Sequence, residues 1–150
     1  MIRMQRLAWL LLLTTAAAPA LAQDTGNCPR LPPESGLTWQ HKAIGNDADL
    51  CRALRADGSE AFGLYIARDT PFEPKGGDRA EEGVLDGRPI RWYRSELAGR
   101  PNVQARETLV ELPDGRKAHI WVQAPTGDAL RESLGLAQSM QLGAAHLSQN

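Results

Sequence analysis

The sequence has 150 residues, of which 17 are Lys or Arg and 18 are Asp or Glu, and 42% of the residues are hydrophobic. This length suits one ordinary domain, and the hydrophobic share is too high for an intrinsically disordered chain. Nucleic-acid binding needs a clustered excess of Lys and Arg, which this near balance of charges lacks, so we expect no nucleic acid among the partners.

The first 22 residues show the three parts of a secretory signal peptide. A positive start with two arginines precedes the apolar run 7–13, and small residues lead to the ending Ala20-Leu21-Ala22. A membrane-spanning helix needs about 20 apolar residues, and Thr14 and Pro19 interrupt this stretch. We therefore predict cleavage after Ala22, a small soluble protein exported to the periplasm or the cell exterior, and no membrane span after removal of the signal.

Two cysteines, Cys28 and Cys51, are present. In an oxidising compartment such a pair most simply forms one disulfide, and two free thiols are the alternative. The bridge would close a loop of about 24 residues, which is worth about 3 kcal/mol in the chain-entropy model. It would tie the Pro-rich, extended segment 23–36 onto the folded body.

Alternating hydrophobic residues predict the first strands between residues 37 and 66. Segment 37–44 is short and β-prone, whereas segment 49–56 fits either one face of a short helix or a buried strand. An Asp-Gly turn signal at 57–58 is followed by alternating apolar residues at Phe62, Leu64 and Ile66. This pattern favours the strand and a hairpin across the turn.

Segment 69–83 predicts a long loop, because it combines Pro71, Pro74, Gly76 and Gly77 with several charged residues. Loops of this length are uncommon inside a compact domain and are usually functional or mobile. A solvated, mobile excursion is the simpler interpretation. The alternative is that the loop is the inserting element of a secreted inhibitor or immunity-type protein.

Two more hairpins are predicted after this loop. The first turns at Asp86-Gly87, and the second joins segments 103–112 and 117–124. On segment 117–124, the period-two alternation of a strand separates aliphatic side chains from polar and aromatic ones. The first set is Ala118, Ile120, Val122 and Ala124, and the second set is His119, Trp121 and Gln123.

One strong helix closes the predicted domain. Thr126 or Asp128 can serve as its N-cap, and Gly143 can end it. Its apolar stripe at 3.6-residue spacing matches the aliphatic face of segment 117–124, so we expect the two to pack together. The stripe contains Leu130, Leu134, Ala137 and Met140, widened by Ala129, Ser133 and Gln141.

The predicted fold class is therefore α+β, with a mostly antiparallel sheet of five to seven strands built from hairpins and packed by one C-terminal helix. Residues 37–143 form the single domain, and residues 144–150 form a frayed tail. Because only one strong helix is predicted, the second face of the sheet is left to water or to a partner.

The sequence lacks the motifs of common catalytic and cofactor sites. None of the three histidines has a second ligand at metal-like spacing, and no serine stands in a G-x-S-x-G turn. The glycine pair at 76–77 lacks the context of a phosphate-binding loop. We therefore expect no cofactor and no metal.

Candidate binding residues lie on the face that the aliphatic stripe does not use. Trp121 and His119 share this face, and Arg91 and Tyr93 hold an equivalent position on a neighbouring strand. Trp, Tyr and Arg are enriched where binding energy concentrates in interfaces. The alternative is that the helix covers this face and that Trp121 is simply buried.

We expect a non-catalytic binding or interaction role, with a protein, a peptide or a small ligand as the partner. One alternative is the inhibitor or immunity-type protein that uses loop 69–83. A less favoured alternative is a hydrolase whose site is assembled around His119 with Glu107 and Arg91. An enzyme is thus the less favoured class.

Overall fold

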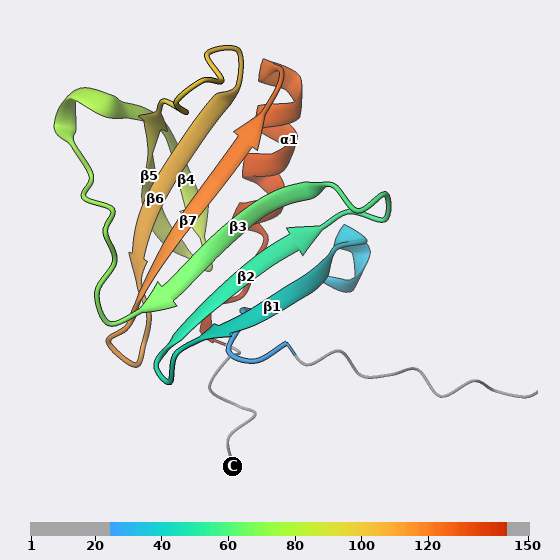
Figure 1. The fold of residues 1–150 in the computed structure, drawn as a ribbon, viewed down its shortest axis with the longest axis vertical. Helices are drawn as coiled ribbons and strands as arrows, with labels where there is room; N and C mark the ends of the chain where they lie inside the picture. Colours follow the sequence, from blue (N-terminus) through green and yellow to red (C-terminus); the bar gives the residue numbers. More distant parts are fainter. Residues whose placement is uncertain (1–24, 144–150) are drawn as a thin grey trace, which may run out of the picture.

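The structure is a computed structural model that describes residues 25–143. Seven strands and one α-helix form an α+β domain (Figure 1). The elements are β1 (Thr38–Ile44), β2 (Ala48–Leu54), β3 (Glu60–Ala67), β4 (Arg79–Leu85), β5 (Arg88–Ser95), β6 (Gln104–Glu111), β7 (Lys117–Ala124) and α1 (Gly127–Gln138). The predicted signal peptide 1–22 and the predicted tail 144–150 lie outside the described residues. Within residues 25–143, no helix is long and apolar enough to cross a membrane.

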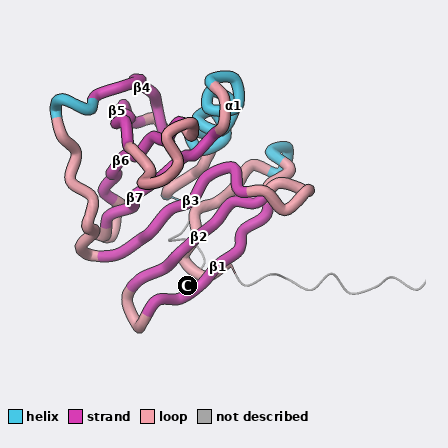
Figure 2. Tube along the Cα trace, turned by 45° about the horizontal axis from the view of Figure 1, so that its top comes forward, coloured by secondary structure: helices cyan, strands magenta, loops and turns pink. Residues whose placement is uncertain are grey.

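All seven strands form one antiparallel sheet in the order β1-β2-β3-β7-β6-β5-β4. Two groups of hairpin-connected strands, β1–β3 and β4–β7, meet where β3 pairs with β7. The connection from β3 to β4 therefore carries the chain from the middle of the sheet to its far edge. Figure 2 shows α1 lying against one side of this sheet. The predicted fold class is confirmed.

The turn between β4 and β5 has the backbone that the sequence predicts. Asp86 and Gly87 both have left-handed φ angles, +49° and +75°. Two such residues in succession are required by the type I′ turn, whose twist matches that of a hairpin. The Asp86 carboxylate also accepts hydrogen bonds from the backbone N–H groups of Leu142 and Gly143, both at 3.1 Å. The turn is thereby tied to the segment that follows the helix.

The register of β7 is the predicted one, because its aliphatic side chains face α1. Ile120 and Val122 are fully buried, and they belong to the same core as Leu130 and Leu134 of the helix. The N-cap is Thr126, whose side chain accepts a hydrogen bond from the backbone N–H of Ala129 at 3.2 Å. We call this side of the sheet the helix face and the opposite side the open face.

The predicted helix end at Gly143 is wrong, because α1 ends at Gln138. The hydroxyl of Ser139 donates a hydrogen bond to the carbonyl of Leu136 at 2.6 Å, and such local bonds compete with helix continuation. The chain then extends, so that Gln141 pairs with Arg30 in an isolated bridge. Met140 still reaches the core, but Gln141 is exposed and does not widen the apolar stripe.

The predicted loop 69–83 is also wrong in extent. It ends in a short 3-10 turn, Gly76–Asp78, and β4 begins at Arg79. The charged residues at its end belong to an edge strand, where charged side chains are common. Two of them have partners on other strands, since Glu81 binds Arg106 of β6 at 2.7 Å and Glu82 pairs with Arg91 of the adjacent β5. These cross-strand ion pairs could not be read from local composition.

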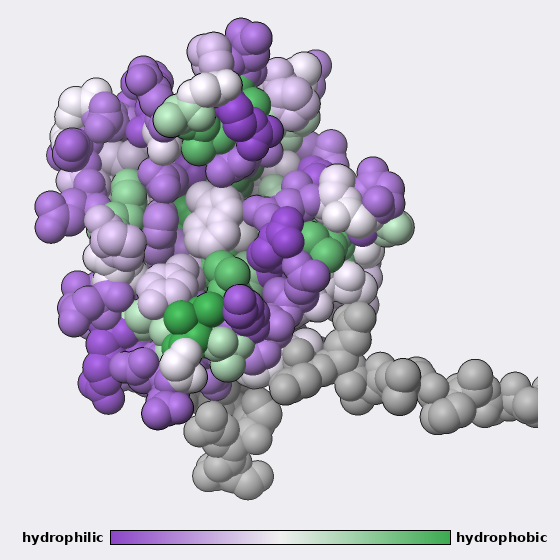
Figure 3. Space-filling view, in the orientation of Figure 1, coloured by the Kyte–Doolittle hydropathy of each residue, from purple (hydrophilic) through white to green (hydrophobic). Residues whose placement is uncertain are grey.

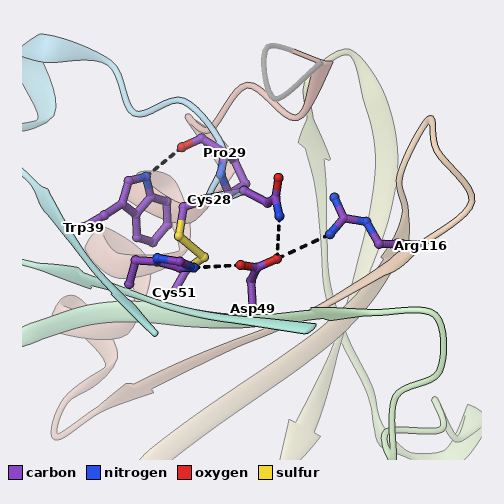
Figure 4. The surroundings of a disulfide bond; sticks show 8 residues. Cys28, Pro29, Trp39, Asp49, Cys51 and Arg116 are labelled. Carbon is purple, nitrogen blue, oxygen red and sulfur yellow. Dashed lines mark hydrogen bonds and ion pairs between the residues drawn. A yellow bond between two sulfur atoms is a disulfide. The ribbon is translucent and has the colours of Figure 1, made fainter. Parts of the chain in front are cut away.

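The N-terminal segment covers the part of the helix face that α1 does not reach, over β1 and β2 (Figure 4). Cys28 and Cys51 form the predicted disulfide, with their Cα atoms 5.8 Å apart. The indole Nε1–H of Trp39 donates a hydrogen bond to the carbonyl of Pro29 at 2.7 Å. The disulfide and this hydrogen bond hold the segment on the sheet.

Beside the disulfide, the buried carboxylate of Asp49 lies among polar partners. Asn27 donates to it at 2.9 Å, His41 Nε2 lies 2.7 Å from it, and an Arg116 nitrogen lies at 3.4 Å. Burial alone would raise the pKa of Asp49, but the hydrogen bonds from Asn27 and His41 and the charge of Arg116 outweigh it and lower the pKa. Arg116 comes from the turn between β6 and β7, so this cluster joins that turn to β2.

Candidate functional site

The open face carries a mixed aromatic and charged surface between two connecting segments. Figure 3, in the orientation of Figure 1, shows pale and green patches enclosed by hydrophilic side chains on this face. The β3–β4 connection lies along one side, and the β5–β6 connection, residues 96–103, lies at one end. Both predicted residues of β7, His119 and Trp121, lie between them and line the same depression.

Trp121 is held flat against the sheet by its neighbour on β3. Gly63 is the direct cross-strand partner of Trp121, and a Cβ atom placed at Gly63 would overlap Cζ2, Cε2 and Nε1 of the indole. Overlap with several ring atoms means that the ring lies face-on over the glycine. A glycine inside a strand commonly marks such a close approach.

A hydrogen bond fixes the rotation of this indole. Nε1–H of Trp121 donates to the carboxylate of Glu60 at 2.9 Å. The other oxygen of Glu60 accepts from Arg52 at 2.6 Å, and Arg52 also binds the side chain of Gln40 at 2.8 Å. The row runs across four strands, β7, β3, β2 and β1, and leaves the second face of the indole turned away from the sheet.

His119 is the second ring of the floor. Its Nε2 lies 3.1 Å from a carboxylate oxygen of Glu107 on β6, and its side chain is 13% exposed. Phe72 of the β3–β4 connection stacks on it, with ring centroids 4.7 Å apart and planes within 6°. The hydrogen bond with His119 lowers the pKa of Glu107, although burial acts in the opposite direction.

The structure brings together three of the four predicted binding residues. Tyr93 reaches the cluster through Phe72, whose ring centroid lies 6.2 Å away, while His119 and Trp121 contact each other directly at 5.6 Å. Arg91 is placed differently. It pairs with Glu82 of the edge strand β4 and so points away from the two rings of β7.

Three adjoining depressions form one groove across the open face, which we call the open-face groove. The central one, of about 150 Å³, contains His119 and Trp121. It shares Ser95 and Glu107 with a depression of about 730 Å³ beside the β3–β4 connection. It shares Gln123 with another of about 390 Å³ near the β2–β3 turn.

Sequence reasoning missed three residues that shape this groove: Phe72, Gly63 and Glu60. The isolated aromatic residue in a segment of Pro, Gly and charges was a usable signal for Phe72. The glycine in the middle of a hydrophobic strand was a signal for Gly63. The position of Glu60 at the edge of the indole depends on the pairing of β3 with β7, which no local pattern discloses.

Among the described residues, no group of three or more His, Cys, Asp or Glu side chains is placed to hold a metal ion. Comparison of the chain with family models, with curated proteins and with solved structures gave no match.

Proposed function

We propose that this chain is an exported, non-catalytic binding protein and that the open-face groove is its binding site. The placement of Trp121 carries the proposal, because this partly exposed indole lines a depression on the open face. Polar side chains on several strands converge around it. Ligand sites commonly combine an aromatic floor with a few polar groups that fix orientation.

Export is supported by two independent features. The disulfide between Cys28 and Cys51 is the kind of bond that forms in oxidising compartments. The N-terminal sequence has the composition of a cleaved signal peptide. Mass spectrometry of periplasmic or secreted protein should find an N-terminus at Gln23, whereas a cell-associated chain that still begins at Met1 would contradict export.

The carboxylates of the groove support binding rather than hydrolysis. Glycoside hydrolysis requires a carboxylic acid whose pKa is raised so that it can donate a proton. Here the contact with His119 lowers the pKa of Glu107. Glu60 is bound by both Arg52 and Trp121. The carboxylates of Glu107 and Glu60 are therefore held in place as hydrogen-bond acceptors.

The position of Phe72 favours the groove over the inhibitor alternative. An inhibitory loop must project from its domain in order to insert into a target. In this chain Phe72 packs down onto His119 and Tyr93, so the β3–β4 connection forms a wall of the groove.

Nuclear magnetic resonance titration of the disulfide-bonded protein tests the proposal. Neutral oligosaccharides, acidic oligosaccharides and short peptides are added separately. At least one class should shift the indole N–H signal of Trp121 and the side-chain amide of Gln123. The indole signals of Trp39 and Trp92 serve as internal controls, because both rings lie on the helix face. If no class shifts Trp121, the groove is not the binding site.

A further inference from the structure

We propose that the ligand of the open-face groove is a neutral, hydroxyl-rich carbohydrate chain, one ring of which stacks on Trp121. This inference rests on the proposed function and adds the class of ligand. It follows from five features of the groove: the fixed indole, the hydrogen-bonding groups around it, the charge balance, the position on central strands and the length.

The indole of Trp121 has the geometry of a stacking platform. Gly63 supports one face of the ring, and the hydrogen bond to Glu60 holds its edge. Little side-chain entropy is therefore left to lose when a ligand packs on the other face. A sugar ring presents a flat surface of C–H groups that suits such a platform, and its hydroxyl groups project sideways.

Hydrogen-bonding side chains line the groove beside the indole, where they are available to hydroxyl groups of a stacked sugar. Gln123 and Glu107 line the central depression with Trp121, and Glu60 and Arg52 line the next one. Gln123 is exposed, and its amide has no hydrogen-bond partner among the described residues. An amide can both donate and accept, as a hydroxyl group does.

The positive and negative charges of the groove are nearly balanced, so they favour neither a polyanionic nor a polycationic ligand. Its lining contains five carboxylates and four cationic side chains, namely Glu60, Glu73, Asp78, Glu96 and Glu107 with Arg52, Lys75, Arg94 and Arg100. The two carboxylates nearest the indole already have partners, since Arg52 binds Glu60 and His119 binds Glu107. A neutral ligand avoids the cost of separating these pairs.

The position of the groove disfavours an extended peptide. Peptides that add to a sheet use the free backbone groups of an edge strand. Trp121 lies on β7, which is paired on both sides, whereas the edge strands are β1 and β4. A peptide over Trp121 would have no free strand backbone with which to form hydrogen bonds. A carbohydrate chain has no peptide backbone and does not require such pairing.

The groove is also long enough for a chain. Its lining runs from Tyr93 on β5 to Arg52 on β2. Four strand spacings of about 4.8 Å separate β5 from β2, or about 19 Å in all. This length accommodates several consecutive sugar rings, so longer oligosaccharides should bind more tightly than a monosaccharide.

Calorimetric titration with neutral tetra- to hexasaccharides of the glucose, xylose, mannose and N-acetylglucosamine series tests the inference. At least one series should bind, and Trp121→Ala should weaken that binding roughly tenfold or more. Gln123→Ala should weaken it several-fold without affecting folding, because this side chain is exposed. Gln104→Ala is the matched control, since Gln104 is an exposed glutamine of the neighbouring strand on the helix face.

The outcomes separate the inference from the function on which it rests. If acidic oligosaccharides or peptides shift the Trp121 signal and neutral oligosaccharides do not, the carbohydrate inference is overturned and the binding function stands. If no ligand class shifts that signal, both are overturned. Equal binding by the Gln123→Ala and Gln104→Ala variants, with Trp121→Ala unaffected, would place any carbohydrate site elsewhere. Cleavage of a bound oligosaccharide would support the ligand class and overturn the non-catalytic role.

Discussion

Neighbouring residues of β7 show how differently the two faces of the sheet are built. Ile120 is fully buried on the helix face and packs in the aliphatic core. Trp121, the next residue, lies half-buried on the open face and is held by a glycine and a carboxylate. At β7, the helix face is fixed by burial of apolar surface, and the open face is fixed by directed polar and ring contacts. Stability and binding should therefore respond to substitutions on different faces.

The largest effect is expected from truncation on the helix face. Leu134→Ala should lower the free energy of unfolding by about 2–5 kcal/mol, because it removes buried methyl groups and leaves a cavity. Urea denaturation measures this loss. Leu136→Ala is the control, since Leu136 is only partly buried on the same helix and should cost less. Equal losses for the two variants would contradict the assignment of the buried stripe.

The disulfide should contribute the next largest effect. Replacing both Cys28 and Cys51 by Ala should lower the free energy of unfolding by about 2–4 kcal/mol, because the unfolded chain gains freedom. Thermal or urea denaturation with and without reductant provides the measurement, and reductant should no longer affect the double variant. Alkylation of both thiols in native, unreduced protein would show that the bridge is absent.

On the open face, His119→Ala should lower the free energy of unfolding by about 1 kcal/mol. The substitution removes the stacking contact with Phe72, and such ring pairs are worth about 0.5–1.5 kcal/mol. Denaturation of this variant measures its stability and ligand titration measures its binding, so the two effects of one open-face substitution can be compared. A loss as large as that of Leu134→Ala would indicate that the open face also belongs to the core.

The smallest effect concerns acid stability. Because contact with His119 lowers the folded-state pKa of Glu107, its contribution is present above the unfolded value of about 4.3 and is lost as the pH falls through the lower folded value. Glu107→Gln should therefore lose less stability than the native chain on acidification in this range. Urea midpoints measured from neutral to acidic pH provide the test, and parallel curves for the two proteins would contradict it.

Local signals were sufficient for most of the fold. The hairpin turn at Asp86-Gly87, the N-cap Thr126 and the alternation along β7 each depend on a few adjacent residues, and the structure has all three as predicted. The predictions of the helix end and of the extent of loop 69–83 were wrong, because residues distant in the sequence determine the structure at both places. Gln141 leaves the helix line to pair with Arg30, and β4 is held by ion pairs from β5 and β6.

The candidate site was predictable only in part for the same reason. Alternation places His119 and Trp121 on one face, so these two residues could be found from the sequence. The pairing of Glu60 and Gly63 with Trp121 requires the junction of β3 with β7, and the stacking of Phe72 requires the path of the β3–β4 connection. Arg91 belongs to the predicted set, but its side chain forms an ion pair with Glu82 of the edge strand β4.

The strand order also has a kinetic consequence. Each strand group can form from contacts close in sequence, but the β3–β7 junction pairs residues 63–67 with residues 117–121. Such non-local pairing is slow, because the entropic cost of closing a long loop comes before the stabilising contacts form. The indole platform consists of Trp121 and Gly63, which face each other across this junction. The groove therefore requires this junction, and we expect the ability to bind ligand to return in refolding experiments no earlier than the pairing of β3 with β7.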